Sequence, residues 1–200
     1  SEHDSGSYNL IKKINLPHIS VDTFPYYYEG PYVANDVINA GYIAAEHLID
    51  IGCQKIAFFN ASKEMSYFSS FKALERGFKK AIMEKKDQQI KGFIIYSDLT
   101  FEGGIQGYNE IYKKEQQCDG IFCVYYLCAY GVIQKAEEKG VTIGKDIAVM
   151  GIDDLETSKF SRVSLTSINQ PYEKIIEQAT KHLIEIIEGK EKKELKKKIK

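Results

Sequence analysis

Residues 127–154 read LCAYGVIQKAEEKGVTIGKDIAVMGIDD, an amphipathic stretch followed by a short apolar run, and this stretch decides the fold. The spacing of its first apolar residues predicts a helix from Leu127 to Lys139, which Gly140 ends as glycine commonly does. The run from Ile147 to Ile152 has the length and continuous hydrophobicity of a strand that is buried on both faces. A helix followed by such a strand is typical of a parallel sheet covered by helices.

The same alternation of short apolar runs and amphipathic stretches continues along the rest of the chain. Four further stretches have helical spacing of apolar residues: 41–48, 71–82, 105–112 and 172–187. We therefore expect an α/β fold in which parallel sheets are flanked by helices. The predicted strands are His18–Asp22, Lys55–Asn60, Gly92–Tyr96, Gly120–Tyr125, Ile147–Ile152 and Leu165–Asn169.

The composition of the 200 residues, with 44% hydrophobic and 28% charged residues, is that of a soluble globular protein. No run approaches the roughly 18 consecutive apolar residues of a membrane span, and the polar start lacks the apolar core of a signal peptide, so we expect a cytoplasmic protein. The net charge of -1 hides an asymmetry, because residues 190–200 carry seven Lys and two Glu and the rest of the chain has a charge of -6. An acidic body does not favour binding of nucleic acid by this chain, and we expect the basic end to be solvated.

The residue types that form metal sites and nucleophiles are not arranged for those roles. Cys53, Cys118, Cys123 and Cys128 lack the spacing of zinc ligands, and we expect buried free thiols in a reducing compartment. The glycines at 103, 104 and 107 have neither the spacing of a dinucleotide-binding loop nor a Walker lysine after them, and no G-x-S-x-G motif occurs. We therefore expect no metal, no cofactor and no enzymatic activity.

Asp153 and Asp154 come directly after a predicted strand, which is where open α/β sheets bind their ligands. Three roles fit this pair: binding Mg²⁺ together with Asp22 or Asp36, accepting a hydrogen bond from a ligand hydroxyl, or capping a turn. The pattern alone does not decide among them.

Several longer stretches resemble the LacI/GalR family of bacterial transcriptional regulators. The run from Asn35 to Phe58 is similar to the segment that follows the first crossover in that family. Residues 149–154 are similar to its Asp-Asp strand end, and residues 164–171 are similar to its return strand and Gln-Pro helix start. Arg76-Gly77-Phe78 falls in register between these motifs, so the resemblance covers residues 15–189.

The resemblance implies a non-enzymatic effector-binding core shaped like a type I periplasmic binding protein, with two Rossmann-like lobes and a sugar-like ligand in the cleft between them. It divides the chain into a partial amino-terminal lobe, residues 1–32 and 165–200, and a carboxyl-terminal lobe, residues 33–164. In the family a helix-turn-helix precedes this core and binds operator DNA as a dimer. We expect that reader and the first strands of the amino-terminal lobe to be missing from this chain, and we expect a homodimer face on the helix Leu127–Lys139 and near Phe101 and Phe160.

The resemblance also carries over individual ligand contacts. It implies that Asp22 and Asp153 are carboxylates that face the ligand. Three other contacts are changed: Leu74 replaces an arginine, Leu99 replaces an aromatic platform, and Tyr125-Tyr126 replaces an Asn-Asp pair. Because an arginine and an amide each make several hydrogen bonds to a sugar, their loss favours a ligand with hydrogen-bond donors on an apolar or aromatic body.

An ordinary sugar stacked on Phe68, Phe101 or Tyr126 is the alternative ligand. Two alternative functions are a sensor domain of the same shape fused to another output, such as an AraC-type reader or a histidine kinase, and a Mg-dependent α/β hydrolase that uses Asp153 and Asp154. The predicted ligand-binding residues are Asp22, Phe68, Ser70, Leu74, Leu99, Phe101, Tyr125, Tyr126 and Asp153.

Overall fold

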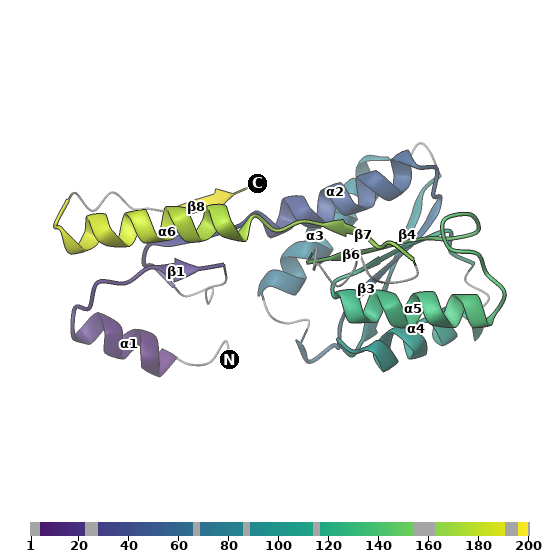
Figure 1. Cartoon of the computed structure of the whole chain (residues 1–200), viewed down its shortest axis with the longest axis horizontal. Coiled ribbons are helices and arrows are strands. Elements are labelled where there is room, and N and C mark those ends of the chain that lie inside the picture. The colour runs from purple at the N-terminus through teal and green to yellow at the C-terminus, as the bar shows by residue number, and fades with distance from the viewer. Residues whose placement is uncertain are drawn as a thin grey trace. The chain divides into compact units, whose positions relative to one another are not determined.

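The computed structural model describes residues 5–22, 28–65, 69–85, 89–113, 117–153, 163–190 and 196–199. The chain divides into two compact units (Figure 1). The smaller unit comprises Ser1–Asp36 and Pro171–Lys200, and the larger unit comprises Val37–Gln170.

The larger unit is built on a five-stranded sheet whose strand order is β4-β3-β5-β6-β7. All four pairings are parallel, as the alternation of strands and helices predicts. Strand β3, which lies between β4 and β5, is enclosed along most of its length, because every residue after its first is buried. The strands are β3 (Lys55–Ala61), β4 (Lys91–Ser97), β5 (Gly120–Cys123), β6 (Ala148–Ile152) and β7 (Thr166–Ile168).

Two pairs of helices cover the two faces of this sheet, α2 (Val37–Asp50) with α3 (Ser69–Glu84) and α4 (Phe101–Lys113) with α5 (Tyr126–Glu138) (Figure 1). Successive side chains of β3 point to opposite faces of the sheet, so they belong alternately to two separate cores. Ile56 and Phe58 pack into the core on the α2 and α3 side, whereas Ala57 and Phe59 pack into the core on the α4 and α5 side. The predicted α/β class is therefore confirmed.

Glycines set how closely the paired helices approach each other. A Cβ atom at Gly41 of α2 would lie 2.1 Å from the carbonyl oxygen of Leu74, and one at Gly77 of α3 would lie 1.9 Å from that of Ile38. The same arrangement joins α4 and α5, where a Cβ atom at Gly104 would lie 2.1 Å from the carbonyl oxygen of Cys128. No side chain fits at such distances, so glycine is required where the helix backbones touch.

The glycine-rich run of α4 has the same structural role. Gly103, Gly104 and Gly107 are all buried inside the helix. A Cβ atom at Gly107 would lie 2.4 Å from the ring of Phe59 on β3. These glycines therefore bring α4 close to its neighbours, and they do not form a phosphate-binding loop.

The smaller unit has a three-stranded parallel sheet in the order β1-β2-β8. Its strands are β1 (Ser20–Val21), β2 (Tyr32–Asn35) and β8 (Lys196–Ile199), and its helices are α1 (Ser5–Lys13) and α6 (Tyr172–Ile187). Its small core contains Val33, Ile175, Ala179 and Ile199.

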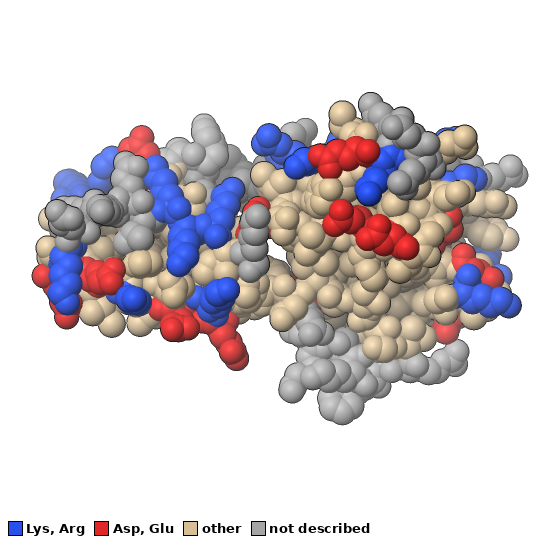
Figure 2. Space-filling view, turned by 90° about the horizontal axis from the view of Figure 1, so that it is seen from above, with Lys and Arg blue, Asp and Glu red and all other residues tan. Residues whose placement is uncertain are grey.

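The prediction that the basic end is simply solvated was wrong in part. Lys196–Ile199 forms β8, which pairs with β2, and Ile199 is only 5% exposed. The lysines of β8 do remain at the surface, and Figure 2 shows Lys and Arg side chains interspersed with Asp and Glu over the smaller unit. Lys197 donates a hydrogen bond from Nζ to Oε1 of Gln178 on α6 at 2.8 Å.

The boundaries of the two units differ from the predicted ones at both crossings. Residues 33–36 were assigned to the carboxyl-terminal lobe, but β2 pairs with β1 and β8 in the smaller unit. Residues 165–170 were assigned to the amino-terminal lobe, but β7 pairs with β6 in the larger unit. In the part of the chain that the structure describes, no helix has the length and hydrophobicity that crossing a membrane requires.

The basis for the predicted dimer face was also wrong in part. Most apolar side chains of α5 are buried, including Val132 and Ile133, and its exposed positions include Gln134, Glu137 and Glu138. This helix therefore does not present the exposed apolar face on which that expectation depended. Phe160 lies outside the described residues.

Candidate functional site

The carboxyl ends of β5 and β6 place three of the predicted ligand-binding residues at one edge of the larger unit's sheet. Tyr125 is the N-cap residue of α5, two residues after β5 ends, and Tyr126 is the first residue of that helix. Asp153 directly follows β6. Because β5 and β6 are adjacent parallel strands, their carboxyl ends lie side by side, which is the usual location of ligand sites in open α/β sheets.

The two tyrosines form an aromatic pair at this edge. The ring centroids of Tyr125 and Tyr126 are 4.7 Å apart with an interplanar angle of 61°, and Tyr130, one helical turn further, lies edge-on to Tyr126 at 6.4 Å. All three side chains are half-buried. Edge-to-face contacts of this kind stabilise ring orientations, so the pair presents a fixed aromatic surface.

Asp153 is held in position by its backbone and by a neighbouring side chain. Its φ of 69° lies in the left-handed region, which aspartate tolerates better than most residues. Its amide N–H donates a hydrogen bond to the carbonyl oxygen of Ile168 on β7 at 3.2 Å. Nε2 of Gln170 donates to Oδ1 of Asp153, so the carboxyl group is oriented by the chain that leaves β7.

The electrostatics of the site follow from these contacts. A hydrogen bond with Tyr126 is the main reason that the pKa of the Tyr125 hydroxyl is raised, and burial and the charges of Tyr126 and Asp153 raise it further. Tyr125 is therefore a neutral hydroxyl at neutral pH. The arrangement combines a carboxyl group, which accepts hydrogen bonds, with phenol hydroxyls and two aromatic rings, and it suits a ligand that has O–H or N–H donors on an apolar body.

Four other predicted ligand-binding residues belong to the larger unit. Leu74 is 4% exposed and belongs to the core between α2, α3 and the sheet, so we leave it out of the proposed site. Leu99 and Tyr125 both pack against that same core cluster. Ser70 is half-buried in the first turn of α3, and Phe101 is the half-buried first residue of α4.

Two predicted residues lie outside the described residues. They are Phe68 and Asp154.

Asp22 belongs to the smaller unit, where it follows β1. Like Asp153, it has a left-handed backbone, with a φ of 67°. Its amide N–H donates to the carbonyl oxygen of Val33 at 2.9 Å, and its Oδ1 accepts a hydrogen bond from Nδ2 of Asn35 at 3.0 Å. Each aspartate is thus oriented by a carboxamide side chain, Asn35 for Asp22 and Gln170 for Asp153.

The cysteines are free thiols, as predicted, with Cys53, Cys123 and Cys128 buried and Cys118 half-buried. Burial is the main reason that the pKa is raised to about 11 for Cys53 and to about 12 for Cys118, and the charge of Asp119 raises both further. Both side chains are therefore protonated at neutral pH and are poor nucleophiles. Within the described ranges no group of three His, Cys, Asp or Glu side chains is close enough to hold a metal ion.

Two polar residues with defined partners were missed from the sequence. Gln170 was noted only as part of a motif, and its bond to Asp153 depends on the pairing of β6 with β7. Asn60 is completely buried near the end of β3 and donates a hydrogen bond to Oε2 of Glu75 on α3 at 2.9 Å. An asparagine that ends an apolar strand run is the one signal in the sequence that marks it.

Residues 45–199 match the model of the family described as periplasmic binding protein-like domain. The chain belongs to this family. As an effector-binding core of the LacI type, it has the α/β architecture of that family, with parallel sheets flanked by helices.

Curated relatives of this periplasmic binding protein-like chain are named as repressors. The HTH-type transcriptional repressor PurR of Glaesserella parasuis is 30% identical over 188 residues, which are 94% of this chain and 54% of the relative. The ribose operon repressor of Haemophilus influenzae is 26% identical over 88% of this chain and 52% of the relative. The chain therefore spans about half the length of the curated relatives that it matches.

Solved LacI-family structures have the same fold. A LacI family transcriptional regulator from Enterococcus faecium, with bound ribose, is 25% identical with a TM-score of 0.82, over 98% of this chain and 72% of that one. A regulatory protein of the LacI family from Chloroflexus aggregans has a TM-score of 0.84 at 22% identity, over 95% of this chain and 67% of that one. The second likeness supports the fold alone.

Proposed function

We propose that this core binds a small neutral or cationic effector at the carboxyl edge of the larger unit's sheet and thereby regulates a longer LacI-type protein. The observation that carries the proposal is the cluster of Tyr125, Tyr126 and Asp153, with Gln170 orienting the carboxyl group. The half-buried carboxyl group of Asp153 with a fixed side-chain partner is a specific hydrogen-bond acceptor, and the adjacent rings supply apolar contact area.

The proposed effector class follows from these groups. A ligand with O–H or N–H donors can donate to Asp153, and an apolar or aromatic body can pack against Tyr125 and Tyr126. Aromatic glycosides and aromatic amines fit this description better than a free hexose, and the carboxyl group disfavours a phosphorylated sugar. Ribose is bound by the Enterococcus faecium relative, so neutral pentoses form the natural comparison set.

The regulatory part of the proposal concerns the full-length protein. We propose that effector binding shifts an equilibrium between operator-competent and operator-incompetent states of a cytoplasmic homodimer, whose helix-turn-helix reader is a separate segment. Its support is the naming of the relatives as transcriptional repressors. We propose no catalytic step, and the described site offers no activated nucleophile beside Asp153.

A thermal-shift screen tests the effector class. Neutral sugars including ribose, sugar phosphates, aromatic glycosides and aromatic amines are compared side by side on the same chain. An effector at about a hundredfold its dissociation constant stabilises the native state by about 2.7 kcal/mol, and we expect this stabilisation from the aromatic compounds.

The variants Asp153→Ala and Tyr126→Ala locate the binding. Both substitutions should reduce the shift. A shift from plain sugars alone that disappears in Asp153→Ala but persists in Tyr126→Ala would contradict the aromatic part of the proposal.

A further inference from the structure

β4 forms one edge of the five-stranded sheet. Among the described residues it pairs with β3 alone, over all seven positions from Lys91↔Lys55 to Ser97↔Ala61. The backbone groups of an edge strand that point away from the sheet are available to pair with another extended chain.

The sequence of β4 does not protect this edge. Proteins usually block an edge strand with charged residues, a proline or a bulge inside it. Between Lys91 and Ser97, β4 reads Gly-Phe-Ile-Ile-Tyr, which contains none of the charged or proline residues. The aromatic side chain of Tyr96 is 37% exposed at this edge. An apolar and aromatic strand without these protective residues has the composition of a strand that receives a partner.

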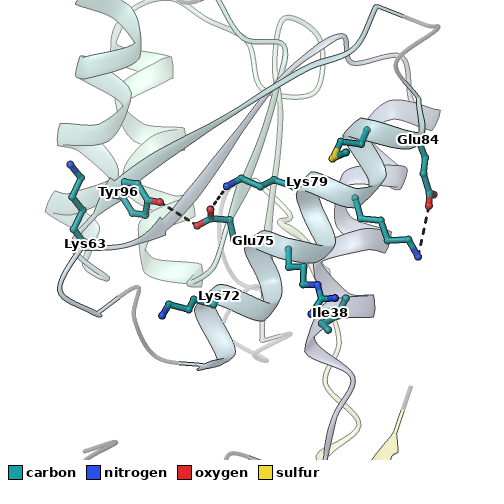
Figure 3. A pocket seen from close by; sticks show the side chains of 10 residues that line it. Ile38, Lys63, Lys72, Glu75, Lys79, Glu84 and Tyr96 are labelled. Atoms are coloured by element: carbon teal, nitrogen blue, oxygen red, sulfur yellow. Dashed lines mark hydrogen bonds and ion pairs between the residues drawn. The ribbon is translucent and has the colours of Figure 1, made fainter. Parts of the chain in front are cut away.

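A basic groove of about 1090 Å³ lies on the α3 side of β4, which contributes Tyr96 to its lining (Figure 3). Five basic and two acidic side chains give it a net charge of +3. Its lining comprises Ile38, Lys63, Lys72, Glu75, Arg76, Lys79, Lys80, Met83, Glu84 and Tyr96.

Glu75 organises the part of this groove that is next to the strand. Its side chain is 16% exposed and accepts a hydrogen bond from Asn60 at 2.9 Å. It also accepts hydrogen bonds from the Tyr96 hydroxyl at 3.3 Å and from Nζ of Lys79 at 2.5 Å (Figure 3). The Glu75 carboxylate is already satisfied by donors of the chain itself, and Arg76 adds a positive charge to the lining from the same helix, so the groove favours an external acidic group.

A second groove, of about 500 Å³, runs beside β4 on the α4 side. Lys63 and Tyr96 line both grooves, so the two flank the same edge. Three acidic side chains, Glu64, Asp98 and Glu110, and the shared Lys63 give the second groove a net charge of -2. The two sides of the β4 edge thus have opposite charge.

We propose that the β4 edge is a docking site for an extended segment of another protein, which adds to the sheet as a further strand. Side chains of a strand alternate between the two faces, so the segment would place acidic residues in the α3 groove and neutral or basic residues in the α4 groove. Main-chain hydrogen bonds to β4 would supply affinity, and the opposite charges of the grooves would select the sequence.

The charges disfavour two other occupants. One is a second copy of this chain, whose β4 would pair antiparallel to the first about a two-fold axis normal to the sheet. This pairing would bring the two α3 grooves, each with a net charge of +3, side by side, and the repulsion between them opposes it. A nucleic acid would satisfy the α3 groove but would bring its phosphates to the acidic α4 groove.

The test uses labelled heptapeptides and fluorescence anisotropy with the whole chain. The probe alternates Glu and Thr, the first control has the same composition with all Glu residues in one block, and the second control is the alternating peptide with N-methyl groups on alternate amides. We expect the probe to bind at least about tenfold more tightly than either control, because only it combines the alternation with free backbone donors. Amide hydrogen exchange should become slower in residues 91–97 when the probe binds.

Charge reversal at the groove provides a matched pair of variants. Arg76→Glu should weaken binding of the probe about fivefold, since it replaces an attraction by a repulsion at the surface. Lys174→Glu makes the same change of net charge on α6, which contributes no residue to the lining of the groove, and should leave the binding unchanged.

Several results would overturn the proposal. They are no binding of the alternating probe, equal binding of the block or N-methylated peptide, protection from exchange only outside β4, or equal weakening by both charge reversals. A dimer held by β4 in light scattering, or tighter binding of a single-stranded oligonucleotide than of the probe, would assign the edge to one of the rejected occupants.

Discussion

At the scale of single residues, the two aspartates that the family resemblance marked have the same local design. Asp153 and Asp22 both have φ values near +70° and both accept a hydrogen bond from a carboxamide side chain. The resemblance predicted which carboxylates to consider, but the sequence did not reveal Gln170 and Asn35 as their partners. Side-chain partners depend on strand pairing, and β6 with β7 and β1 with β2 bring these residues together only in the folded chain.

Two substitutions of Asp153 distinguish its effect on stability from its effect on effector binding. Asp153→Gly relieves the left-handed conformation, whereas Asp153→Ala puts a Cβ atom there without the side-chain hydrogen bond, so we expect the glycine variant to be about 1 kcal/mol more stable than the alanine variant. Both variants should bind the effector more weakly. Urea unfolding monitored by circular dichroism measures the difference, and an alanine variant as stable as the glycine variant would show that the backbone strain at Asp153 is unimportant.

The thiol of Cys118 is expected to be slow to react although it is half-buried rather than buried. Burial and Asp119 raise its pKa to about 12, so at pH 8 it has about a thousandfold less thiolate than a thiol of pKa 9. Iodoacetamide labelling followed by mass spectrometry should modify Cys118 at least about a hundredfold more slowly in the native chain than in urea. Similar rates in the two states would contradict this assignment.

At the scale of helices and strands, the strongly periodic segments were predictable and the weakly patterned ones were not. The helices α2 to α6 and the strands of the larger unit follow from apolar spacing. β8 was missed because three of its four residues are exposed lysines, and its pairing with β2 uses main-chain hydrogen bonds that composition does not encode. β2 has only four residues and follows Pro31, so its apolar run is too short to stand out.

Because α2 and α3 approach each other closely, we expect Gly77→Ala to destabilise the chain, although helix propensity alone would predict stabilisation. Gly77→Ala would gain about 0.8–1.0 kcal/mol from propensity, but its Cβ atom would lie 1.9 Å from the carbonyl oxygen of Ile38. We expect a net loss of about 1–3 kcal/mol as the helices move apart. The control is Lys72→Ala at an exposed position of the same helix, and a Gly77→Ala chain with an unchanged urea midpoint would refute the contact.

At the scale of the whole molecule, family membership and the parallel α/β architecture were predictable because they depend on long, specific motifs and on the period of apolar residues. The boundaries of the two units moved by four to six residues, since β2 and β7 are short and their sheet is chosen by pairing rather than by their own composition. The opposite charges on the two sides of β4 were also invisible in the sequence, because they arise from α3, α4 and the turn after β3 together.

The central claim, that Tyr125, Tyr126 and Asp153 form an effector site, is tested most directly by isothermal titration calorimetry. The strongest binder of the thermal-shift screen is titrated into the unmodified chain and into the Asp153→Ala, Tyr126→Ala and Lys174→Ala variants. A hydrogen bond to a charged group contributes about 1.5–3 kcal/mol, so we expect Asp153→Ala to weaken binding by about tenfold to a hundredfold, Tyr126→Ala to weaken it as well, and Lys174→Ala to bind normally. Unchanged affinity in both Asp153→Ala and Tyr126→Ala would contradict the account.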